Sequence, residues 1–179
     1  TSQAEIIKNY AIANEVDIEK FVQTSRDISN ETKVPLAAIN QAIASTISSA
    51  GAADPKLIQD SVRTAARIDP NNPEKIEFTA AAITDLANAT GEKDTEKLAA
   101  LLLTGLQTAR VTDAKRYFEN ATKAVGIAIQ SNPAQNKTEL IREVFALFGA
   151  ATKPSIDPKG ESTGTFVIQE LEAVNEIFK

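Results

Sequence analysis

The chain has 179 residues and a net charge of −5, and it contains neither Cys nor His. These absences exclude disulfides and thiolate chemistry and remove the commonest general base and zinc ligand. The negative charge gives no broad attraction to polyanions, so we expect no specific nucleic-acid partner.

Apolar residues recur every three or four positions along most of the chain, which predicts α-helices. Ser2 and Glu5 fit a capping box that opens a short first helix through Tyr10. Asp54 followed by Pro55 combines a side-chain acceptor with a preset φ angle, as at many helix starts. In chain order, the predicted helices span about 2–10, 16–30, 35–50, 54–68, 72–90, 94–109, 112–131 and 136–148, and a last one starts near 165.

The sixth predicted helix, 94–109, is the most apolar. Its leucines cluster so closely that the helix would be apolar on nearly every face, which places it at the centre of a bundle. The chain is also rich in Ala and poor in aromatic residues, so we expect small side chains to let the helices approach closely. The five leucines are Leu98, Leu101, Leu102, Leu103 and Leu106.

The segment 149–164 interrupts this helical pattern, because Gly and Pro recur within it. We interpret it as a flexible segment before the last helix. It is either a binding loop or hinge, or a connection that contains an ordinary turn at 157–160, and we favour the turn. Its helix-breaking residues are Gly149, Pro154, Pro158, Gly160 and Gly164.

The predicted fold is therefore all-α, an irregular bundle of about nine helices joined by short Pro, Gly and Asn turns. The length and apolar content suffice for one core, so we expect a single helical domain over 1–179. No apolar run reaches the ~18 residues of a membrane span. Six helix starts recur about every 19 residues, as in an α-solenoid, but the units share no residue pattern, which favours the bundle.

No motif for catalysis, metal binding or cofactor binding occurs in the sequence. Two carboxylate pairs, Glu74 with Glu77 and Glu170 with Glu172, leave a carboxylate-dependent enzyme as an alternative. Acids on helix surfaces more often serve solubility. We therefore predict a protein that is not an enzyme, with no catalytic residue, no cofactor and no metal ligand.

The last predicted helix carries apolar residues spaced 4, 3 and 4 apart, the rhythm of a coiled coil. The stripe either docks on the core of the same chain, which we favour, or mediates self-association. The chain begins at Thr1, contains no Met, and ends within an apolar pattern, so we expect it to be excised from a longer protein. The stripe consists of Val167, Leu171, Val174 and Phe178.

Several segments, taken in order, resemble the core region of bacteriophage tail tape measure proteins. They run from about Ile28 to Val174 and include most of the chain. They read ISNETKVPLAAINQAIASTISSAG, DSVRTAARI, FTAAAITDLANATGEKDTEKLAALLLTGLQTARVTD, LFGAAT and STGTFVIQELEAV.

The resemblance implies a structural role in the virion tail, in a protein made in the host bacterial cytoplasm. Proteins of this family occupy the tail tube as long helical chains, set its length, and leave when DNA is delivered. The implied partners are tube, tail tip and assembly chaperone proteins, and copies of the chain itself. The family offers no catalytic residue for this region. The alternative function is an α-solenoid-like scaffold that binds a protein or peptide partner.

Overall fold

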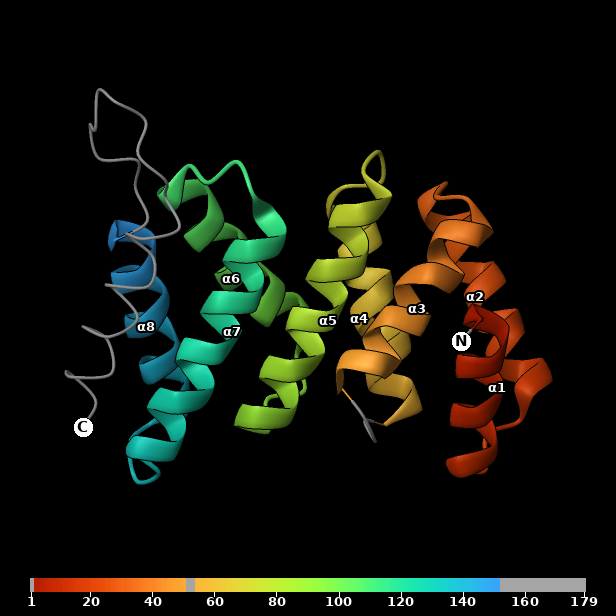
Figure 1. The fold of residues 1–179 in the computed structure, drawn as a ribbon, viewed down its shortest axis with the longest axis horizontal. Helices are drawn as coiled ribbons and strands as arrows, with labels where there is room; N and C mark the ends of the chain where they lie inside the picture. The colour runs from red at the N-terminus through yellow and green to blue at the C-terminus, as the bar shows by residue number, and fades with distance from the viewer. Residues whose placement is uncertain (1, 51–53, 152–179) are drawn as a thin grey trace. The chain divides into compact units, whose positions relative to one another are not determined.

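The computed structural model describes residues 2–50 and 54–151, which fold into eight α-helices without a strand (Figure 1). The all-α prediction is confirmed, and the helix count in these ranges is close to the expected nine. The ninth predicted helix lies outside them. The helices are α1 Gln3–Ala13, α2 Ile18–Thr32, α3 Leu36–Ala50, α4 Pro55–Ile68, α5 Pro73–Thr90, α6 Thr95–Ala109, α7 Ala114–Ser131 and α8 Lys137–Ala151.

Short polar side chains begin these helices by accepting hydrogen bonds from the first free backbone N–H groups. Ser2 Oγ accepts from the backbone N–H of Glu5 at 3.2 Å, as the capping box predicts. Asp54 Oδ1 accepts from the N–H of Lys56 at 2.7 Å, with Pro55 in the first turn. The helix starts read from these residues are confirmed.

The structure corrects the predicted start of the seventh helix. The sequence predicted it from about residue 112, but Asp113 is the N-cap of α7, and its Oδ1 accepts from the N–H of Arg116 at 3.1 Å. A carboxylate at this position also interacts favourably with the positive end of the helix dipole. Asp113, and not the neighbouring Thr112, is therefore the N-cap of α7.

By their internal contacts, the residues form two compact units. The first contains the described residues up to Asn88 together with Glu92–Ala99, and the second contains Ala89–Gly91 and the described residues from Ala100 to Ala151. In the first unit, α3 packs against α1, α2 and α4, and α2 packs against α4. In the second, α7 packs against α8. The predictions of a single domain and of an excised chain stay predictions.

The core of the first unit combines branched aliphatic side chains with alanines. Ile39 and Ile43 of α3 are fully buried, and Ile58 and Val62 of α4 are equally inaccessible to solvent. The alanines have almost no side-chain volume, so the backbones can approach closely, as the composition suggested. The buried alanines of this cluster are Ala42, Ala65, Ala66 and Ala80.

Polar contacts also tie α4 to its neighbours in the first unit. Arg63 Nε lies 3.3 Å from a carboxylate oxygen of Glu31 on α2. The hydroxyls of Thr64 and Thr95 are 3.0 Å apart and buried, which joins α4 to the first turn of α6. The ion pair is partly exposed and contributes at most about 1 kcal/mol, so it mainly fixes the position of the helices.

The core of the second unit contains an aromatic cluster. The ring of Tyr117 packs edge-on against Phe118 and Phe148, with centroids 5.6 Å and 5.3 Å away. Its hydroxyl lies against Gly105 of α6, where a Cβ atom would overlap it. That buried hydroxyl has no hydrogen-bond partner in the described part of the chain. Gly105 is therefore required by the space that Tyr117 occupies.

Gly149 corrects a predicted helix boundary. The sequence placed the irregular segment from this residue onward, but α8 continues through it to Ala151. A Cβ added at Gly149 would lie 3.4 Å from the carbonyl oxygen of Gly105 and 3.5 Å from Thr108. These distances are ordinary van der Waals contacts, so Gly149 lies within α8 despite its low helix propensity and without a steric need for glycine. The rest of the segment 149–164 lies outside the described residues.

The leucines of α6 divide by helical position. Leu98, Leu102 and Leu106, four residues apart, form one buried face. Leu101 and Leu103 are only half-buried, so the expectation that all five are hidden at the centre of a bundle is wrong for these two. They lie on either side of the buried face, at positions of α6 that neighbouring helices cover only in part.

Truncating the central leucine of α6 tests this division. We expect Leu102→Ala to lower the free energy of unfolding by about 2–5 kcal/mol, because it removes fully buried methyl groups and leaves a cavity. The matched change Leu103→Ala, one position away and half-buried, should cost clearly less. Urea unfolding followed by circular dichroism measures both. Equal losses would show that the two leucines are equally buried.

The space at Gly105 that the Tyr117 hydroxyl fills, which we call the notch, gives a second test. Gly105→Ala should destabilise the fold by about 1–3 kcal/mol, because the new methyl group collides with the Tyr117 hydroxyl. Gly126 of α7 is the matched control, since a Cβ there meets nothing within 4 Å. Gly126→Ala should stabilise by about 0.5–1 kcal/mol through helix propensity. If both substitutions shift the melting temperature in the same direction, Tyr117 does not fill the notch at Gly105.

Candidate functional site

The self-association stripe suggested by the sequence is not among the residues that the structure describes. Val167, Leu171, Val174 and Phe178, the proposed self-association stripe, lie in the range 152–179. The acid pair at 170 and 172 lies there too. The other pair is described: Glu74 is exposed in the first turn of α5, and Glu77 lies three residues later on the same helix. The candidate sites within 2–50 and 54–151 are a polar seam and an apolar groove, both in the first unit.

The polar seam joins α3 and α5. Gln41 Nε2 donates to one carboxylate oxygen of Glu77 at 3.1 Å, and the Ser45 hydroxyl donates to the other. Farther along, the Ser49 hydroxyl donates to Asp85 at 3.1 Å. The three donors are spaced four residues apart, which puts them on one face of α3. The seam thus aligns neutral donors on α3 with carboxylates on α5.

The two carboxylates of the seam differ in environment. Burial raises the pKa of Asp85 above its usual value of 3.8, and the hydrogen bond from Ser49 partly offsets the rise. Glu77 and Asp85 are eight residues apart on α5, or about 12 Å along the helix axis. This is farther than the two carboxyl groups of a glycosidase, which lie at most about 9.5 Å apart. We therefore interpret the seam as helix-pairing contacts.

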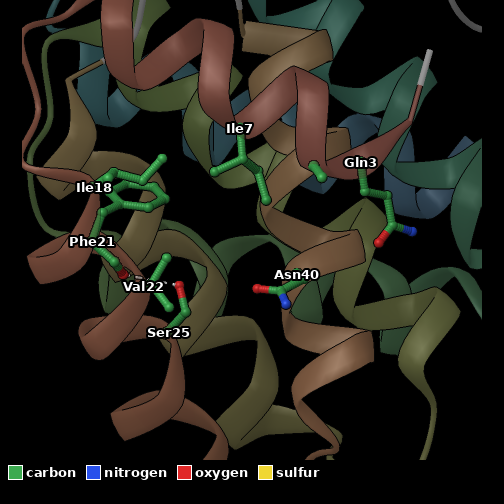
Figure 2. Close-up of a pocket in the computed structure, with 8 residues that line it drawn as sticks. Gln3, Ile7, Ile18, Phe21, Val22, Ser25 and Asn40 are labelled. Carbon is green, nitrogen blue, oxygen red and sulfur yellow. Dashed lines mark hydrogen bonds between the residues drawn. The ribbon is translucent and has the colours of Figure 1, made fainter.

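The apolar groove lies between α1, α2 and α3 and has a volume of about 310 Å³. Figure 2 shows Ile7 of α1, the side chains of α2 and Asn40 of α3 on three sides of the groove. Phe21 is buried, while Ile18 and Val22 are 41% and 37% exposed. The groove therefore presents aliphatic surface to solvent.

Hydrogen bonds fix the part of α2 that forms the groove. The backbone carbonyl of Phe21 accepts from the Ser25 hydroxyl at 3.2 Å and from Gln59 Nε2 of α4 at 3.0 Å. The Phe21 ring packs against Tyr10, with centroids 6.2 Å apart. In contrast, the carboxamide of Asn40 makes no hydrogen bond to the described residues. The groove thus combines a fixed apolar wall with an available amide.

The sequence predicted only part of this arrangement. The predicted second helix, 16–30, corresponds to α2, in which Phe21, Ser25 and Ile28 are buried. Ile18, on the same face, is the first residue of α2 and is 41% exposed. Spacing shows which residues share a helix face but not where the neighbouring helix stops covering it.

Within the described ranges, no group of three acidic, His or Cys side chains is placed to hold a metal ion. In the same part of the chain, no helix has the length and apolarity needed to cross a membrane. Comparison of the chain with protein-family models, curated proteins and solved structures found no significant match.

Removing the charge of Asp85 tests the electrostatics of the seam. Its pKa is raised in the folded state, so folding disfavours its ionised form. The wild-type protein should therefore gain stability as the pH falls through the raised pKa, with the full gain present below 3.8. Asp85→Asn cannot ionise, so it should have this additional stability at every pH, and its side-chain oxygen can still accept the hydrogen bond from Ser49.

The melting temperatures of Asp85→Asn and wild type should accordingly differ most near neutral pH, and the difference should shrink on acidification. Glu74→Gln, which changes an exposed acid on the same helix, is the control. A difference that stays constant from pH 7 to pH 3 would show that Asp85 has no raised pKa.

Proposed function

We propose that this chain is a non-enzymatic structural protein of a phage tail, a folded portion of a tape measure protein. Such a protein sets tail length and is released at DNA delivery. The observation that carries the proposal is the order of the segments similar to tape measure cores, from about Ile28 to Val174. Its location would be the virion tail, after synthesis in the host bacterial cytoplasm.

Two physical features support this role. The cores of both units bury alanines or glycines at helix contacts, which suits helices that must pack in little space. The sequence contains no Cys, so no disulfide opposes drawing the chain out through a narrow channel. The proposed partners are proteins of the tube and tail tip, assembly chaperones and copies of the chain itself.

An in-frame deletion in the parent gene tests the length-setting role. Removing 55–90, which covers α4 and α5, should shorten the tail by about 54 Å if each residue spans 1.5 Å of helix. Electron micrographs of purified tails measure this, and peptide mass spectrometry of the same particles tests whether the chain is present. Tails of unchanged length, or particles without these peptides, would contradict the proposal.

A second function, a helical scaffold that binds a protein or peptide partner, is favoured by the groove between α1, α2 and α3. Its wall is held in place by the contacts of Phe21, while Ile18 and Val22 remain open to solvent. Preformed apolar grooves of this kind receive the apolar face of a helix.

A further inference from the structure

The apolar surface of the groove continues over the outer face of α2. A second hollow shares Ile18 and Val22 with the groove and is completed by Glu19, Gln23 and Arg26. This exposed strip, which we call the α2 face, therefore consists of two aliphatic side chains bordered by polar and charged ones. It is the surface that a further helix would contact.

The α2 face carries one negative and one positive side chain along the same side of the helix. Glu19 and Arg26 are seven residues apart, so they lie on the same side of α2, about 10.5 Å from each other along the axis. Both are exposed. Neither forms an ion pair within 2–50 and 54–151. By contrast, Asp27 accepts from Gln23 Nε2 at 3.0 Å and so has a partner within α2.

We propose that the α2 face binds a second copy of this chain, with the two α2 helices antiparallel about a two-fold axis near Val22. In that arrangement Glu19 faces Arg26 of the second copy, and Arg26 faces Glu19 of the second copy. A two-fold interface needs such self-complementarity. When two helices pair in antiparallel orientation, residues that flank the apolar contact on one helix lie next to those that flank it on the other.

The apolar and charged parts of the face act together. Ile18 and Val22 lose their remaining exposure when the second α2 covers them, which supplies the hydrophobic contribution. The two ion pairs set the direction of the helices, because a parallel pairing would oppose like charges. A basic peptide would fit less well, since it would satisfy Glu19 and repel Arg26. A second copy satisfies both.

This inference rests on the second proposed function, the helical scaffold, and is independent of the tape measure role. The area offered by one helix face is small, so the dimer should be weak and concentration-dependent. Sedimentation equilibrium of the 179-residue chain over a wide concentration range measures its dissociation constant.

Charge reversal gives the decisive experiment. Glu19→Arg alone and Arg26→Glu alone should each weaken the dimer about tenfold or more, because each creates two like-charge contacts. The double variant should dimerise again to within about threefold of wild type, and an equimolar mixture of the two single variants should form heterodimers. Glu143→Arg, an exposed acid on α8, is the matched control and should change nothing.

Circular dichroism and melting temperatures confirm that each variant is folded. A chain that stays monomeric at every concentration overturns the inference, as does a dimer insensitive to both charge reversals. Titration of such a monomer with a basic amphipathic peptide of leucine and lysine, in wild type and in Val22→Glu, tests the alternative occupant, whose binding Val22→Glu should abolish. This result would overturn the second-copy inference and leave the scaffold proposal standing.

Discussion

Close contact between helix backbones is the constraint on which the rest of this structure depends. Aromatic residues make up only 5% of the chain, so few large side chains can fill space between distant helices. Ala42, Ala65 and Ala80 instead let the helices of the first unit approach. Dispersion contacts accumulate only at such short range. The polar seam lies where two helices are in close contact, and the groove lies where neighbouring helices no longer cover each other.

Local chemistry explains what the sequence could predict. Asp54 with Pro55 and Ser2 with Glu5 determine helix starts through contacts within a few residues, so these starts are visible in the sequence. The errors arise where a distant residue decides. Gly149 is a poor helix former by propensity, yet it lies within α8 and close to Gly105 and Thr108 of α6.

The candidate sites depend on longer separations still. Gln41 and Glu77 are 36 residues apart, and no spacing rule relates a glutamine on one helix to a glutamate two helices later. The exposure of Ile18 and Val22 likewise depends on how α1 lies across α2 and α3, which is a property of packing. The stripe that the sequence offered for self-association belongs to residues outside the described ranges. Sequence patterns thus predict helices well and predict the surfaces between them poorly.

The fit of Tyr117 into the notch at Gly105 also restricts how this sequence can diverge. The two positions are twelve residues apart on different helices, so a change at one alters the cost of a change at the other. A larger residue at 105 destabilises this fold less once the phenol at 117 has been replaced by something shorter. Mutational order therefore matters here: one route passes through an intermediate with an empty notch, and the other through a collision.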